Sequence, residues 1–217
     1  MWKFHGSIVW QLLLLALVTM LMGGCATCQK PAAIAVEELI EVGADTLVRV
    51  GSSGSMQPHV HTGDVVIVNA SIRDEGTTQH YLPIEFPAVA DIEVVNAMLE
   101  GALRLGYTTH TGISQSKDSF YGEVERPRMP MAAHLEERWN AFIAGGALCS
   151  EMESSALFIL SSIYRKRAGG VMLVINEFDL AEVDEEDAAK HMAEFDADRV
   201  IKVAIEGLKI LIQADRS

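Results

Sequence analysis

The chain has 217 residues, of which 49% are hydrophobic and 22% are charged, and its formal net charge at pH 7 is -13. This apolar content can fill the core of one compact domain, and the length favours one domain over two. The acidic balance argues against sequence-independent binding to nucleic acid, because such binding depends on Lys and Arg side chains that displace counterions from phosphates.

The first 30 residues differ in character from the rest. Lys3 precedes an apolar run over residues 8–22, and small residues then lead into Cys25. This order is typical of an export signal with a lipoprotein-type cleavage site, but a short apolar run fits a buried helix or strand equally well. We expect residues 1–30 to form a signal, an anchor or a buried element, and residues 31–217 to form the globular domain.

Hydrophobic periodicity in the remainder predicts helices alternating with strands. The expected helices cover residues 32–42, 91–105, 134–144, 154–165 and 185–213, the last with a break near Asp196. The expected strands cover residues 46–50, 65–68, 107–114 and 170–175. This alternation predicts an α/β fold with a central mixed or mainly parallel sheet flanked by helices.

The cysteines and histidines do not predict a metal site. Cys25 and Cys28 form a lone C-x-x-C with no second pair at zinc-site spacing, and Cys149 stands alone. His59 and His61 lie in a turn-like segment, which favours surface histidines. We therefore expect no metal.

A Gly- and Ser-rich segment over residues 51–55 follows the strand that ends at Val50. Glycines let backbone N–H groups approach an anion, the Ser52 hydroxyl adds a donor, and Arg49 offers a planar fork that fits phosphate. A turn between two strands would have the same composition. A serine hydrolase elbow is excluded, because Ser55 stands where that motif needs Gly.

Two further segments carry polar groups suited to a sugar and a base. The run Ser150-Glu151-Met152-Glu153 offers carboxylates that could accept hydrogen bonds from a sugar diol, although Ser150 and Glu153 also spell a capping box for the next helix. The stretch 120–130 has aromatic, acidic and basic residues together with Pro127 and Pro130, and by itself it predicts a surface loop.

Together these segments resemble the nucleoside phosphorylase family, with its uridine phosphorylases the closest. The matching segments keep their order and spacing from Ala33 to Ser217, which is stronger than any single motif. They are 33–39, 48–55, 57–58, 63–66, 86–91, 120–130 and 150–154. The resemblance implies a three-layer, phosphorylase-like α/β fold that here lacks the family's first strands.

The resemblance also implies a reaction and a set of site residues. A nucleoside and inorganic phosphate would react without another cofactor, in the cytoplasm, within a dimer-based homo-oligomer such as a hexamer. Phosphate would be oriented by Arg49 and Ser52, ribose would be held by Met152 and Glu153, and the base would meet Phe120, Glu123 and Arg128, or Arg126 in another register. Ser53, Gly54 and Glu151 would also bind substrate. Glu123 stands where the family has Gln, and a carboxylate cannot donate to a base carbonyl.

The chain departs from the family pattern where phosphate should bind. The family's P-G-D-P-x-R loop has no counterpart, and Asn176-Glu177 follows the last buried strand where an Arg is usual. Losing two arginine contacts predicts phosphorolysis weakened by about 10² to 10⁴-fold. The alternative is a nucleoside-binding or remnant protein without catalysis, either free or anchored to a membrane. Ser114 and Lys117 form an S-x-x-K motif, but the partner motifs of acylating enzymes are absent.

Overall fold

A computed structural model describes residues 29–178 and 196–216. The expected apolar segment 8–22, Cys25, Cys28 and the first part of the helix expected from residue 185 lie outside these residues. No helix within the described ranges has the length and apolar character needed to span a membrane. The described helices and strands, in chain order, are α2 (Gln29–Glu41), β1 (Thr46–Ser55), β2 (Val65–Asp74), η1 (Thr78–His80), β3 (Ala88–Val89), α3 (Ile92–Arg104), β4 (Thr109–Lys117), α4 (Phe120–Val124), η2 (Arg126–Arg128), α5 (Ala132–Ala144), β5 (Cys149–Glu151), α6 (Ser154–Tyr164), β6 (Arg167–Asn176) and α8 (Ala197–Ala214).

The strands form one mixed sheet that closes on itself. Their order is β3-β2-β4-β5-β1-β6, and β6 also pairs with β2. Strands β2, β4 and β5 run parallel to one another, whereas β1 and β6 run parallel to each other and antiparallel to the first group. The mixed sheet was expected, but the closure was not, because hydrophobic periodicity does not report which strands pair.

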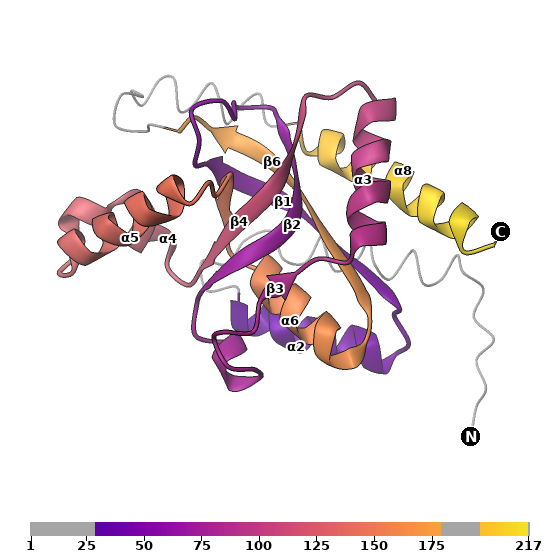
Figure 1. The fold of residues 1–217 in the computed structure, drawn as a ribbon, viewed down its shortest axis with the longest axis horizontal. Helices are drawn as coiled ribbons and strands as arrows, with labels where there is room; N and C mark the ends of the chain where they lie inside the picture. Colours follow the sequence, from indigo (N-terminus) through magenta and orange to yellow (C-terminus); the bar gives the residue numbers. More distant parts are fainter. Residues whose placement is uncertain (1–28, 179–195, 217) are drawn as a thin grey trace.

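Helices cover the sheet on both sides, which confirms the α/β class. Helices α2 and α6 lie side by side below the sheet in Figure 1, while α3 and α8 pack together at its right. Each pair covers its own apolar cluster, one centred on Phe158 and the other on Met98. Helices α4 and α5 project from the opposite side as an arm.

Strand β1 is longer than expected and includes the Gly- and Ser-rich segment. It pairs with β6 from Thr46 to Gly54, with a register irregularity between Ser53 and Gly54, and it meets β5 at Gly54 and Ser55. The expectation of a loop over residues 51–55 was therefore wrong. Ladder hydrogen bonds to β6 outweigh the weak strand preference of Gly and Ser.

The segment after β2 is fixed by a buried arginine. Arg73 is only 8% exposed, and its guanidinium donates to the carbonyl oxygens of Thr78 (3.0 Å), Leu82 (2.8 Å) and Phe86 (2.6 Å). A guanidinium has five donors in a rigid fork, so one side chain can hold several carbonyls of an irregular segment. This contact orders the chain between β2 and β3 next to the start of α6.

Helices α3 and α8 cross at two glycines. A Cβ atom on Gly101 would lie 2.9 Å from the backbone nitrogen of Gly207, and one on Gly207 would lie 2.6 Å from the sulfur of Met98. Both positions therefore need the absence of a side chain. The backbones approach so closely that α8 cannot move away without exposing the cluster around Met98.

We predict that Gly101→Val lowers the free energy of unfolding by about 1 to 3 kcal/mol, because the added side chain forces the two helices apart. Urea unfolding followed by circular dichroism measures the change. Leu103→Val is the control, because Leu103 lies on the same helix and is 63% exposed. Equal stability of the two variants would contradict the close crossing.

Candidate active site

The contact between Arg49 and Glu153 joins the middle of β1 to the start of α6. The guanidinium donates to Oε2 of Glu153 from Nε at 3.1 Å and from Nη2 at 2.5 Å. The side chains are 23% and 13% exposed, respectively. A cation and a carboxylate separated by 104 positions in the chain thus share one partly buried place. The sequence had assigned Arg49 to phosphate and Glu153 to ribose.

Gly51 makes this contact possible. Arg49 and Gly51 lie on the same face of β1, because side chains alternate along a strand. A Cβ atom on Gly51 would lie 1.9 Å from Nη1 of Arg49. The guanidinium folds back over the glycine, where it also donates from Nη1 to the carbonyl of Val50 at 2.7 Å. The glycine is therefore needed because it leaves room for the arginine side chain, and not because the backbone turns sharply there.

Glu151 holds the start of α6 in place. Its Oε2 accepts from the backbone nitrogens of Glu153 (2.8 Å) and Ser154 (2.9 Å), and its Oε1 accepts from the hydroxyls of Ser114 and Ser116. Glu151 is 3% exposed. Its carboxylate is thus turned into the protein, and this buried setting differs from the substrate contact expected of Glu151. It positions Glu153 instead.

The expected capping box at the start of α6 was wrong. Helix α6 has Glu153 as its N-cap residue with no hydrogen bond from that side chain, and Ser150 belongs to β5. The carboxylate of Glu151 supplies the acceptor for the first N–H groups, which a negative charge at a helix N-terminus does well. This frees the side chain of Glu153 for Arg49.

The buried cation Lys117 at the end of β4 forms a second polar group with Glu123 and Ser150. Its Nζ donates to Oε1 of Glu123 at 2.7 Å and to Oγ of Ser150 at 2.5 Å. The hydroxyl of Ser150 lies 2.8 Å from Oε2 of Glu123 and 2.9 Å from Oε1 of Gln115. Strand β5, which carries Ser150 and Glu151, therefore links this group to the Arg49–Glu153 contact.

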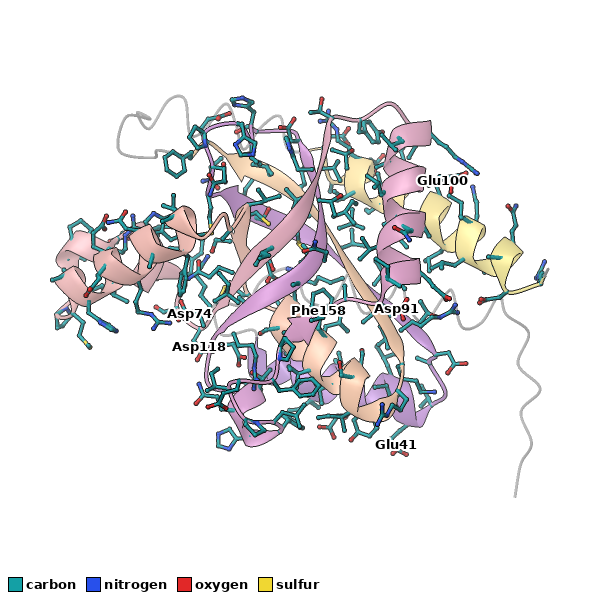
Figure 2. The ribbon with its side chains drawn as sticks, in the orientation of Figure 1. Glu41, Asp74, Asp91, Glu100, Asp118 and Phe158 are labelled. Carbon is teal, nitrogen blue, oxygen red and sulfur yellow. The ribbon has the colours of Figure 1, made fainter. Side chains whose placement is uncertain are left out.

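A pocket of about 190 Å³ lies between this group and the arm formed by α4 and α5. Asp74 and Asp118, labelled in Figure 2, mark the side where β2 and β4 end. The arm contributes Arg126, Trp139 and Phe142. Of the residues predicted for the site, Glu123 lines the pocket.

Phe120 and Arg128 lie outside this lining. The Phe120 ring is 46% exposed and 6.0 Å from Nζ of Lys117, which places it beside the pocket at the start of α4. Arg128 has a side chain that is 61% exposed and pairs with Glu125. Arg126 is the more buried arginine, with its guanidinium 4.6 Å from the Trp139 ring. The structure thus brings Arg126 rather than Arg128 to the pocket.

The remaining predicted residues surround the Arg49–Glu153 contact with different orientations. By strand alternation, Ser52 has its side chain on the face of β1 opposite to Arg49. Ser53 is 4% exposed, and its hydroxyl points to the carbonyl of Leu173. Gly54 lies against the Asn176 side chain, and Met152 is half-buried between the two glutamates. The hydroxyls of Ser52 and Ser53 therefore do not converge with the Arg49 guanidinium.

Sequence reasoning missed Lys117 as a site residue and noticed it only in an S-x-x-K pattern. The Ser114 hydroxyl of that pattern lies within hydrogen-bond distance of Glu151 (3.2 Å) and of the Ser71 hydroxyl (2.9 Å), so it belongs to the buried cluster under α6. Within the described ranges, no group of three or more His, Cys, Asp or Glu side chains is placed to hold a metal ion. Burial raises the pKa of the Cys149 thiol to about 12, so this thiol remains protonated at neutral pH.

Burial raises the pKa of the Glu153 carboxyl above its ordinary value, the Arg49 guanidinium opposes this shift, and the Glu151 carboxylate adds to it. The folded protein therefore retains the Glu153 proton at pH values where the unfolded chain has lost it. The stability that this proton contributes is present below the ordinary Glu pKa and is lost as pH rises through the folded pKa.

We predict that Glu153→Gln becomes more stable relative to the natural protein as pH increases. The difference in thermal midpoint, variant minus natural protein, should become more positive from about pH 4 to about pH 8, because the amide has no proton to lose. Thermal unfolding at several pH values measures it. A difference that is constant or falls with pH would contradict the assignment.

We predict that Glu151→Gln lowers the free energy of unfolding by about 2 to 4 kcal/mol. The glutamine side chain replaces one carboxylate oxygen by an NH₂ group, so the backbone or hydroxyl donors that this oxygen accepted from lose their acceptor. Urea unfolding measures the loss. Glu37→Gln is the control, because that carboxylate accepts a single hydrogen bond from Tyr81 at the surface. A loss no greater than the control's would show that Glu151 does not organise α6.

Comparisons with known proteins identify the family of the chain. Residues 16–211 match the model of the phosphorylase superfamily. The chain is 45% identical over 183 residues to a uridine phosphorylase of Treponema pallidum, an alignment that covers 84% of this chain and 69% of the relative. Identity to the uridine phosphorylase of Escherichia coli is 35% over 182 residues, covering 82% of this chain and 70% of the relative.

Two further relatives are more distant from the chain than the first, and one of them is named for a different nucleoside. The uridine phosphorylase of Thermococcus kodakarensis is 40% identical over 183 residues, covering 77% of this chain and 65% of the relative. A guanosine phosphorylase of Halorubrum lacusprofundi is 29% identical over 183 residues, covering 83% of this chain and 71% of the relative. The chain thus spans about two thirds of the length of these relatives. On the family match and these identities, the chain belongs to the phosphorylase superfamily.

Proposed function

We propose that the chain is a uridine phosphorylase-like pentosyltransferase, which transfers ribose from uridine to inorganic phosphate. The observation that carries this proposal is the Arg49–Glu153 contact, which places a fixed cation and a carboxylate at one partly buried place. The reaction needs both, one for the anionic nucleophile and one for the sugar diol. The uridine phosphorylases among the relatives support the choice of reaction.

Phosphate would replace Glu153 as the partner of Arg49. The edge of β1 that faces β5 could also bind phosphate near Arg49. Among the described strands, β5 pairs with β1 only at Gly54 and Ser55, so backbone groups of β1 before Gly54 have no strand partner on that edge. The Val50 carbonyl faces Arg49 across that edge, so the backbone N–H groups of Val50 and Ser52 face the same way. Ser52 would then contact phosphate through its backbone N–H, because its side chain lies on the other face of β1.

Ribose would bind through Glu153, with Met152 beside it. A carboxylate can accept hydrogen bonds from both hydroxyls of a sugar diol. Because a hydrogen bond to Glu151 fixes the backbone at Glu153, the positions that the Glu153 carboxylate can reach are restricted. When ribose takes Glu153, Arg49 loses its partner and becomes available to phosphate, so the two substrates would favour each other's binding.

With phosphate and nucleoside bound in this way, one bond at ribose C1′ is exchanged for another. An oxygen of phosphate bonds to ribose C1′ as the bond from C1′ to the base nitrogen breaks, and the base takes the bonding electrons and a proton. The products are uracil and ribose 1-phosphate. Fixed charges around the reactants supply the catalysis by orientation and electrostatics, and phosphate is the co-substrate rather than a cofactor.

We predict that Glu153→Ala lowers kcat/KM for uridine by about 10² to 10⁴-fold, because two hydrogen bonds to a charged group are lost. Release of uracil in the presence of phosphate measures the rate. The matched control is Glu206→Ala, whose carboxylate also pairs with an arginine, Arg104, at the distant α3–α8 crossing. The proposal fails if the natural protein releases no more uracil than the Glu153→Ala variant.

A nucleoside-binding role without phosphorolysis is the second candidate. Its supporting observation is the acidic setting at the end of β6, where Glu177 binds the backbone nitrogen of Thr62 at 2.9 Å beside Asn176. The family that the chain resembles usually has an arginine at this position. Phosphate would therefore meet one cation fewer in this chain, and phosphorolysis would be slow. Calorimetric binding of uridine without uracil release would favour this role, and absence of uridine binding would remove both.

We also propose that copies of the chain assemble as a dimer-based homo-oligomer, such as the hexamer that the resemblance implies. The resemblance motivates this proposal, and apolar side chains that remain exposed, including Ile84, Phe86 and Val89 near η1 and β3, support it. Contact with another copy would cover such side chains. Sedimentation at several protein concentrations tests it, and a monomer throughout would contradict it.

A further inference from the structure

Lys117 is a buried cation that the proposed reaction has not yet used. Its side chain is 8% exposed and that of its partner Glu123 is 12% exposed. Burying an ion pair costs several kcal/mol per ion in desolvation, so such a pair is poor evidence for a purely stabilising role. The pair lies on the wall of the pocket rather than in the apolar core.

The hydrogen-bond inventory of Lys117 leaves one donor. An ammonium group has three N–H bonds. Two are directed at Glu123 and Ser150, and no further acceptor for Nζ is found among the described residues. Each carboxylate oxygen of Glu123 has two lone pairs and uses one of them, Oε1 for Lys117 and Oε2 for Ser150. Each oxygen can therefore accept a second hydrogen bond. The pair thus presents a donor and an acceptor side by side.

Arg126 adds a second donor on the same wall. Its Nε donates to Glu136 at 2.7 Å and its Nη1 donates to the Glu123 carbonyl at 2.7 Å, which leaves Nη2. Trp139 and Phe142 add aromatic rings to the lining of the same pocket. Such a lining suits a flat ring, because the ring has apolar faces and a polar edge that needs donors and an acceptor.

We infer that Lys117 and Glu123 together read the imide edge of a pyrimidine base. Glu123 accepts the hydrogen bond from the ring N3–H, and Lys117 donates to an adjacent carbonyl oxygen. The inference rests on the proposed function and deepens it by making Lys117 a specificity-determining residue. It also resolves the difficulty raised by Glu123, because the donor that a carboxylate lacks comes from the neighbouring ammonium.

This arrangement discriminates among bases. Uracil and thymine have an N3–H between two carbonyls, which matches the donors and the acceptor. Cytosine has a lone pair at N3, which would face the Glu123 carboxylate, and an exocyclic amine, which would face a cation. A pocket whose polar groups are left unpaired rejects such a ligand strongly. The ammonium also stabilises negative charge on the carbonyl as the base leaves ribose.

The test is calorimetric binding of nucleosides, which does not require turnover. We expect Lys117→Met to bind uridine about 10- to 10²-fold more weakly than the natural protein, the effect of losing a hydrogen bond from a charged group. Lys117→Arg, which keeps a donor, should recover part of the affinity. The matched control is Lys166→Met, which removes another lysine paired with an aspartate, Asp45, away from the pocket.

A second arm uses the natural protein alone, so it remains decisive if Lys117→Met does not fold. We expect 3-methyluridine and cytidine to bind at least about 10-fold more weakly than uridine, because neither offers an N3–H to Glu123. Equal affinity for uridine and 3-methyluridine, or a folded Lys117→Met variant with natural affinity, would overturn the inference alone. Absence of any uridine binding to the natural protein would overturn the proposed function and this inference with it.

Discussion

The buried carboxylate of Glu151 is the constraint on which the site depends. One side chain accepts hydrogen bonds from the start of α6 with one oxygen and from β4 hydroxyls with the other. A carboxylate at 3% exposure is tolerated because all of these donors converge on it. The contact fixes where α6 begins relative to the strands, and therefore where Glu153 meets Arg49.

The closed sheet explains how distant segments reach that place. Strand β5 has only three residues, yet it joins β4 to β1 and brings Ser150 next to Lys117 while Glu151 faces the serines. The polar ends of β2 and β4 lie beside the arm of α4 and α5, where Asp74 contacts Arg138 and Gln115. One short strand thus connects the place proposed for phosphate and ribose to the pocket proposed for the base.

Much of the architecture could be predicted from periodicity, because long apolar patterns mark helices and buried strands. The helix expected over residues 91–105 is α3, capped by Asp91, and the run 170–175 lies within β6. Periodicity did not predict β5, which is too short to show a pattern, nor the extension of β1 through its glycines and serines. Those features depend on pairing partners far away in the sequence.

The candidate site was predictable in its residue types but not in their roles. Resemblance identified Arg49 and Glu153, and the structure joins them. It could not indicate that Glu151 turns inward, that Arg126 rather than Arg128 reaches the pocket, or that Lys117 is buried, because a charged residue in a sequence is ordinarily solvated. Each of these features depends on neighbours in three dimensions that the sequence order does not reveal.

The central claim is that one site holds phosphate at Arg49, ribose at Glu153 and the base beside Lys117 and Glu123. A crystal structure of the protein with uridine and phosphate tests this claim most directly. The account predicts that the Arg49–Glu153 contact opens, with phosphate on the guanidinium, the ribose hydroxyls on the carboxylate and the pyrimidine edge in the pocket. Uridine bound at another surface, with the Arg49–Glu153 contact intact, would contradict it.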